Sequence, residues 1–192
     1  MDKIEQLIAN APIDNHLTLD DIPDIDLYMD QVIQLFEKKY EGQKRNADEK
    51  VLTKTMINNY AKGKLFFPVN NKKYSKEHLI LISIIYQLKG ALSINDIKLT
   101  LENLNKKVPE AEFNIEKLYN SYLHLAEANA VKFVDDVKEN TNKVKEEIDK
   151  LDDKDSVYLK QLLLITSLIN MSNLYRKAAE KIVDEIGKEQ DA

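Results

Sequence analysis

Residues that break helices are scarce in this chain, and their scarcity is the strongest limit on the folds open to it. Only four glycines and four prolines occur among 192 residues. Few segments therefore require a turn, and long helices are favoured over many short strands. The composition shifts after Pro109, and residues 113–150 contain neither Gly nor Pro. We expect two units, residues 1–108 and residues 109–192.

Apolar spacing and capping residues place the helices of the first unit. The pattern predicts a short helix over 2–10, a helix from about Asp24 to Gly42, and a short helix over 53–62 that stops at Gly63. Ser75 is expected to cap the helix that carries the apolar run 79–88 and is closed by Gly90. Ser93 and Asp96 form the Ser-x-x-Asp signature that opens the next helix. Between these helices, "PVNNKKYS" (68–75) has the content of a tight turn or small hairpin.

Two long helices joined by a short turn are expected in the second unit. Apolar residues recur at helical spacing over residues 113–150, and again from Asp155 or Ser156 to about Gly187. The segment "LDDKDS" (151–156) interrupts the pattern. Two such helices form an antiparallel hairpin. The expected fold class is therefore all-α, with a long C-terminal hairpin.

Composition excludes several classes of protein. The chain has no Cys, which excludes a disulfide scaffold, a thiolate zinc site and cysteine catalysis. The longest apolar run, residues 162–171, is too short to cross a bilayer. The N-terminus lacks the positive charge that begins a signal peptide. We expect a soluble, cytoplasmic protein that makes no contact with membranes.

Signatures of catalysis, metal binding and cofactor binding are also lacking. His16, His78 and His124 lie in three different segments without a carboxylate at metal-site spacing, and we interpret them as surface or satisfied histidines. The acids of "DDIPDID" (20–26) do not follow the spacing of a calcium loop. No Gly-rich phosphate loop or nucleophile elbow occurs. We expect a protein that is not an enzyme, with no catalytic residue, no metal and no cofactor.

One stretch reverses the acidic character of the chain. The net charge is −5, and residues 1–30 carry −7, whereas residues 51–80 carry +5. Residues 52–75 contain five lysines and no acid. The overall acidity argues against non-specific binding to nucleic acid, but a basic face on an acidic body can follow phosphates.

The expected helix over 53–62 has a polar face suited to duplex DNA. Met56, Ile57, Tyr60 and Ala61 fall on one side. The other side carries Lys54, Thr55, Asn58, Asn59 and Lys62. Asn pairs with adenine in the major groove, whereas Thr and Lys contact phosphates. The other candidate DNA contacts are Lys64, Asn71, Lys72 and Lys73. The competing interpretation is a solvated helix face followed by a turn.

The order of residues in this region resembles the DNA-binding domain of MerR-type winged helix-turn-helix regulators. That pattern has a threonine eight residues before a glycine, then Leu, Pro, a short wing, and Tyr-Ser at the start of the next helix. The matching residues, within 52–104, are Thr55, Gly63, Leu65, Pro68, Tyr74, Ser75, Gly90, Ser93, Ile94 and Ile97. The resemblance implies a winged helix-turn-helix fold and a dimer on a palindromic DNA site.

A closer resemblance covers the N-terminal half of the chain. The segments "IPDIDLYMDQVIQLF", "LTKTMINNYAKGKL" and "KKYSKEHLILI" look like the bacterial family called domain of unknown function 1836. The chain departs from the MerR pattern at Asn58 and Asn59, where paired tyrosines are usual, and at Ile57, where arginine is common. Its wing is also shorter, and the loop over 42–51 is longer.

These features lead to two hypotheses of different classes. In the first, the protein is a DNA-binding transcriptional regulator, with helix 53–62 in the major groove and the Lys-rich wing turn, residues 69–74, on the backbone of double-stranded DNA. In the second, it is a non-enzymatic protein-interaction module on a helix-turn-helix scaffold that has lost DNA binding.

The hairpin supplies a second set of candidates. Its aromatic and aliphatic residues extend further than a small domain needs, and they are candidates for a homodimer contact or an effector pocket: Tyr119, Tyr122, Phe133, Leu168 and Tyr175. We expect dimerisation, by analogy with the MerR-type regulators. A weaker third hypothesis is a sensor whose helical half binds an apolar ligand. The sequence leaves open whether an effector is a small molecule or a protein.

Overall fold

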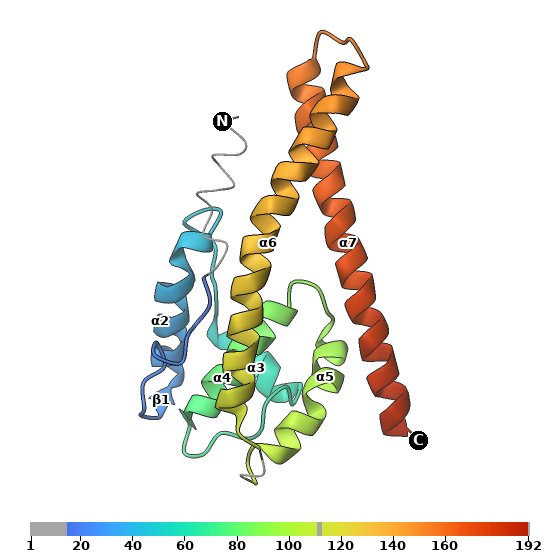
Figure 1. The fold of residues 1–192 in the computed structure, drawn as a ribbon. Coiled ribbons are helices and arrows are strands. Elements are labelled where there is room, and N and C mark those ends of the chain that lie inside the picture. Colours follow the sequence, from blue (N-terminus) through green and yellow to red (C-terminus); the bar gives the residue numbers. More distant parts are fainter. Residues whose placement is uncertain (1–14, 111–112, 192) are drawn as a thin grey trace.

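A small bundle of helices carries a long helical hairpin on one side (Figure 1). The computed structural model describes residues 15–110 and 113–191. Its helices are α2 (Met29–Tyr40), α3 (Lys54–Lys62), α4 (Lys76–Leu88), α5 (Ile94–Lys107), α6 (Ile115–Asp149) and α7 (Ser156–Asp191), with a 3-10 turn η1 (Glu41–Gln43) after α2. The expected helical architecture is confirmed. The helix expected over 2–10 lies outside the described residues.

The described part also contains a small sheet, so the chain is mainly rather than wholly α-helical. Strand β1 (Leu27–Tyr28) pairs antiparallel with β2 (Lys73–Tyr74). The prediction of one helix from Asp24 to Gly42 is wrong at its start, because α2 begins only after β1. Leu27 is buried and aligns with Tyr74, whereas Ile25 is 67% exposed. Pairing between distant segments has overridden the local helical spacing.

Capping residues begin the helices where the sequence predicts. The hydroxyl of Thr53 accepts the backbone N–H of Met56 at 3.2 Å and starts α3. Ser93 accepts the N–H of Asp96 at 3.2 Å, and the Asp96 carboxylate accepts the N–H of Ser93 at 3.1 Å. Ser75 is the N-cap of α4. These bonds satisfy backbone donors that have no partner within the helix.

The core of the bundle extends into the hairpin through Tyr119 on α6. This side chain is fully buried. Its hydroxyl donates to the carbonyl of Leu17 at 2.6 Å and lies 2.7 Å from the hydroxyl of Ser83 on α4. Burial raises the pKa of Tyr119 well above its ordinary value. The structure places Tyr119 in the core, and not at a dimer contact or effector pocket.

The hairpin formed by α6 and α7 is antiparallel as predicted, but its helices diverge below the tip (Figure 1). Near the tip, Leu164 of α7 is buried in a small cluster against α6. At the other end, Val183 joins the bundle core, and a Cβ placed on Gly187 would lie 3.1 Å from the Leu99 side chain on α5. Every residue from 169 to 179 is exposed. Helix α7 is therefore held at both ends and uncovered in the middle.

Candidate nucleic-acid interface and hairpin cleft

Helix α3 packs on the bundle through one narrow face. Ile57 and Tyr60 are buried, and Met56 is half-buried. Ala61, which the sequence places on the same side, is exposed. Only Met56, Ile57 and Tyr60 of this short helix are buried or half-buried. Most of the helix surface is left to solvent.

The five polar residues predicted on the other face of α3 are all exposed: Lys54, Thr55, Asn58, Asn59 and Lys62. At about 100° per residue, they span an arc of about 140°. In the described part of the chain, neither Asn58 nor Asn59 uses its side-chain amide in a hydrogen bond. Lys54 pairs with Asp30 at 2.8 Å, and both are two-thirds exposed, so solvent screens this pair. The face presents amides and cations to solvent.

Helix α3 ends at Gly63, as predicted, in a Schellman motif. The N–H of Leu65 donates to the carbonyl of Tyr60 at 3.0 Å. The left-handed position of the motif is occupied by Lys64, with a φ of 57°, although glycine is usual there. Gly63 has a φ of −72°. A Cβ placed on Gly63 would lie 3.2 Å from the Asn59 carbonyl oxygen and 3.4 Å, an ordinary contact distance, from the Cγ2 of Ile94 on α5.

The predicted tight turn forms between Asn70 and Lys73, where the N–H of Lys73 donates to the Asn70 carbonyl at 2.9 Å. Asn71 and Lys72 have φ values of 49° and 60°, which is typical of a type I′ turn. Both are exposed, whereas Lys73 is half-buried, with its ammonium 5.6 Å from the Tyr28 ring centroid. The strand after this turn pairs with β1.

His78 fastens the segment around the wing turn to α4. Its Nδ1 accepts the backbone N–H of Ser75 at 3.1 Å, and its Nε2 lies 3.2 Å from the Phe67 carbonyl, to which it donates. Only a neutral ring with its proton on Nε2 makes both bonds. Burial lowers the pKa of His78. Both ring nitrogens are engaged, in agreement with a satisfied helical histidine.

Glu37 on α2 fixes the long loop that precedes α3. Its carboxylate accepts the N–H of Val51 at 2.8 Å and that of Leu52 at 3.5 Å, and it pairs with Lys44. Burial opposes the charge of Glu37, but these hydrogen bonds outweigh it and lower the pKa of the carboxyl. The loop therefore sets α3 at a fixed position on α2 despite its length.

A hollow of about 770 Å³ beside the end of α3 brings in residues that the sequence analysis missed. It is lined by Lys64 and by Lys98, Glu102 and Lys106 of α5. Lys106 pairs with Glu102 at 2.8 Å. The three α5 residues follow one another at intervals of four residues, so their side chains share one side of the helix. That spacing is the only signal for them in the sequence, and it is equally typical of a solvated helix face.

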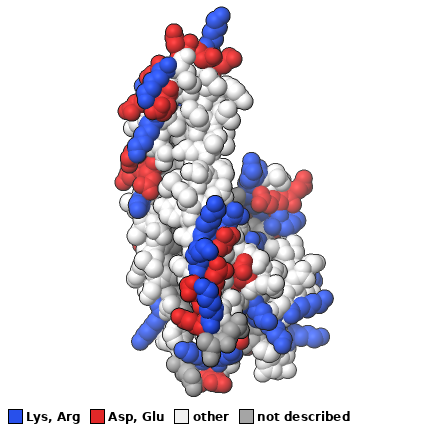
Figure 2. Space-filling view, turned by 90° about the vertical axis from the view of Figure 1, so that its right-hand side faces the viewer, with Lys and Arg blue, Asp and Glu red and all other residues white. Residues whose placement is uncertain are grey.

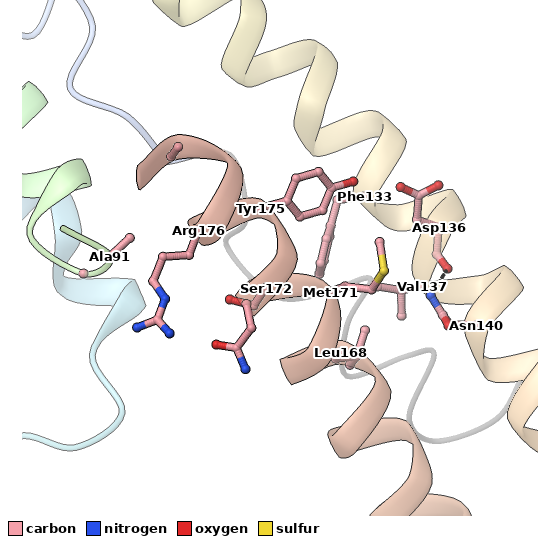
Figure 3. A pocket seen from close by; sticks show the side chains of 13 residues that line it. Ala91, Phe133, Asp136, Val137, Asn140, Leu168, Met171, Ser172, Tyr175 and Arg176 are labelled. Carbon is pink, nitrogen blue, oxygen red and sulfur yellow. Dashed lines mark hydrogen bonds between the residues drawn. The ribbon is translucent and has the colours of Figure 1, made fainter. Parts of the chain in front are cut away.

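Of the five hairpin candidates, Tyr119 lies in the bundle core, three line one cleft between the diverging helices, and Tyr122 lies apart. The cleft has a volume of about 670 Å³ (Figure 3) and is lined by Phe133, Leu168 and Tyr175, among others. Tyr122 packs edge-on against His16 instead, with 5.5 Å between ring centroids. The structure thus separates Tyr122 from the other three.

Helix α7 also carries a broad uncharged surface. Residues 161–175 contain no charged side chain, and Ile165 and Ile169 are 61% and 58% exposed. Figure 2 looks onto the side where α7 lies and shows much of the hairpin without Lys, Arg, Asp or Glu. Among the described helices, none combines the length and the apolar character needed to traverse a bilayer. Exposed apolar surfaces of this kind mark interaction sites.

Comparison with known proteins places the N-terminal half of the chain in a family. No curated protein and no solved structure matches the chain. One family model matches residues 17–122, which run from before β1 to the first two turns of α6 and leave out most of the hairpin. The match covers more than half of the chain and confirms the closer of the two resemblances. The chain belongs to the family described as Domain of unknown function (DUF1836).

Proposed function

We propose that the protein is a DNA-binding transcriptional regulator that inserts α3 into the major groove and sets the wing turn on the neighbouring phosphates. The observation that carries this proposal is the exposed face of α3, where five polar residues lie together within a stretch that has no acid. A major groove is wide enough to admit one α-helix. The narrow buried face of α3 leaves the helix free to enter it.

Asn58 and Asn59 supply the recognition of bases in this proposal. A side-chain amide offers one acceptor and two donors, which match the N6 and N7 positions of adenine. Because these amides are not used in hydrogen bonds among the described residues, contact with a base breaks no internal bond. Thr55, on the same face, contacts a phosphate or the methyl group of thymine.

Lys62, Lys64 and Lys72 supply phosphate contacts. None of them forms an ion pair within the described residues, so each keeps its charge for a partner. Lys64 and Lys72 both have a positive φ, which is unfavourable for a residue with a side chain. Strained backbone positions concentrate at functional sites. Here two of them carry a lysine next to the helix that is proposed to enter the major groove of DNA.

The arrangement of elements supports a MerR-like winged helix-turn-helix for this region. Helix α2 contacts α3, the wing turn follows α3, and β2 returns to pair with β1 in front of α2. The protein acts as a homodimer in this proposal, since a two-fold dimer matches a palindromic DNA site. The uncharged surface of α7 serves as the dimer contact.

Selection of bound sequences from random duplex DNA tests the proposal. We expect enrichment of a palindrome, and an affinity that falls steeply as salt rises. Lys62→Glu should abolish binding, whereas Lys145→Glu, the same charge change on α6, should not. Replacing Asn58 and Asn59 with alanine should reduce the preference for the selected sequence and preserve the salt dependence. If no duplex is enriched at low salt, the proposal is wrong.

A protein-interaction module is the second candidate, and the acids beside the lysines favour it. Lys54 pairs with Asp30 at 2.8 Å, and Lys76 lies 3.5 Å from Asp24 and 3.1 Å from Glu116. Such carboxylates repel a phosphate backbone. The selection separates the two candidates, because a protein-interaction module enriches no duplex at any salt concentration.

A further inference from the structure

The cleft between α6 and α7 has the size and access of a small-molecule site. Its volume of about 670 Å³ lies within the roughly 300–1,000 Å³ of known ligand pockets. Helix α6 forms one wall, α7 the other, and the loop between α4 and α5 contributes Gly90 and Ala91 (Figure 3). The cleft opens to solvent beside the uncovered segment 169–179 of α7.

Aromatic and aliphatic side chains form the middle of the cleft. Phe133 projects from α6 and Tyr175 from α7, and they are 41% and 61% exposed. Val137 and Leu168 line the cleft between the same two helices. Among the described residues, no ring contact joins Phe133 to Tyr175. A planar ring placed beside these two side chains gains apolar burial and aromatic contact.

The charged groups of the cleft lie at opposite ends. Arg176 is at the end near Ala91, and Asp136 is at the other end beside Asn140 (Figure 3). Arg176 forms a half-exposed ion pair with Glu180, in which its Nε lies 3.8 Å from the carboxylate, too far for a hydrogen bond. The guanidinium can therefore hold a carboxylate with its terminal nitrogens. Asp136 repels a carboxylate at its own end and accepts a hydroxyl or amino donor instead.

We propose that this cleft binds a small aromatic carboxylate with a hydroxyl or amino group at the far end of its ring. The ring lies beside Phe133 and Tyr175, the carboxylate accepts hydrogen bonds from Arg176, and the donor faces Asp136. The aromatic and charged residues of the cleft lie beyond residue 122, where the family match ends, whereas Gly90 and Ala91 of its lining lie inside the matched region.

The loop that lines the cleft leads along the chain to a residue that lies against the end of α3. Gly90 and Ala91 lead into Ser93, the N-cap of α5, and then into Ile94, whose side chain packs at Gly63. A ligand that displaces this loop moves the end of α3 through these contacts. This regulatory step rests on the proposed DNA-binding function, whereas ligand binding in the cleft does not.

Calorimetric titration of the full chain with 4-hydroxyphenylacetate tests the site, with the uncharged 4-hydroxyphenylacetamide as the control ligand. We expect saturable binding of the acid, at least about tenfold tighter than the amide, because a charge-assisted hydrogen bond is lost. Arg176→Gln should weaken binding of the acid by a similar factor. Lys177→Gln, a change on the same exposed helix but outside the cleft, should have no effect. Tyr175→Ala should also weaken binding.

Three results overturn the proposal: no saturable heat with the acid, equal affinity for acid and amide, or equal effects of Arg176→Gln and Lys177→Gln. Thermal unfolding of each variant shows that it is folded. Duplex binding is measured separately, with and without the acid. A change in duplex affinity supports the link to α3, and an unchanged affinity overturns that link alone. If the acid binds but no duplex does, the cleft assignment holds and the DNA-binding proposal fails.

Discussion

Lys64 combines an unfavourable backbone conformation with a side chain on the proposed DNA-binding surface. Its φ of 57° belongs to the left-handed region, where an L-residue loses about 1–2 kcal/mol relative to the right-handed helix. Glycine adopts this conformation without a steric penalty but loses more entropy on folding. Lysine is therefore expected to be less favourable than glycine for stability at this position.

Lys64→Gly should raise the free energy of unfolding by about 0.5 to 1 kcal/mol, because relief of the left-handed strain exceeds the added entropy of glycine. Urea denaturation measures this change. Lys62→Gly, two residues earlier in the last turn of α3, should lower the free energy of unfolding by about 0.5 to 1 kcal/mol. If both variants are destabilised equally, the strain at Lys64 has been misjudged.

Single residues also show where sequence analysis stops. The end of α3 at Gly63 was predictable, because a glycine after an apolar periodic segment is a local signal. The sequence does not reveal that Lys64 takes the left-handed position. It also does not reveal that Ile94 of α5 lies against Gly63, since that contact joins two helices.

Among the elements, the segment of the wing turn and helix α4 are joined by the buried side chain of His78. Burial lowers the pKa of His78 below its ordinary value of 6.5, although the Phe67 carbonyl and nearby Glu77 oppose the shift. A lowered histidine pKa means that the fold requires the neutral ring. Its contribution to stability is therefore complete above about pH 6.5 and is lost as the pH falls below that value.

The free energy of unfolding should thus decrease between about pH 7 and pH 5, as His78 is forced to take up a proton. Thermal unfolding across this range measures the decrease. His78→Gln should be less stable at neutral pH and should lose most of the pH dependence. His124→Gln changes an exposed histidine on α6 and should leave the dependence intact. A decrease of the same size in His78→Gln contradicts the assignment.

The elements differ in how far their sequences determine them. Helix α5 was predictable from its own residues, because Ser93 and Asp96 cap it by contacts three residues apart. Strand β1 was not, because Leu27 pairs with Tyr74, far along the chain. Before that pairing is known, the apolar residues around Leu27 fit a helix equally well.

At the scale of the whole molecule, the hairpin was predictable and its opening was not. The long helices follow from apolar spacing without Gly or Pro, but their divergence depends on how Val183 and Gly187 dock on the bundle. Phe133 and Tyr175 were identified as candidates because they are aromatic. Arg176 was not, because a charged residue on a long helix is typical of a solvated surface.

The uncovered side of α7 has the spacing of a helix-packing face. Tyr158, Leu162, Ile165 and Ile169 recur at intervals of three and four residues and are all exposed. They lie on a different side of α7 from Leu164, which contacts α6. A helix that is apolar on two sides is normally covered on both, and a second copy of the same face can cover it by two-fold symmetry.

We therefore expect the chain to be a dimer at micromolar concentration, and Ile165→Asp combined with Ile169→Asp to make it a monomer with unchanged helix content. Two buried carboxylates in each copy cannot be accommodated in an apolar contact. Analytical ultracentrifugation measures the mass, and circular dichroism the helix content. Ile182→Asp, which also changes an exposed isoleucine of α7 but outside the uncharged segment 161–175, should remain a dimer.

The monomeric variant should also lose affinity for a palindromic duplex, because the two half-sites of the duplex are then bound independently. A monomeric wild-type chain would exclude pairing through α7 and leave the cleft and α3 proposals to be judged on their own experiments.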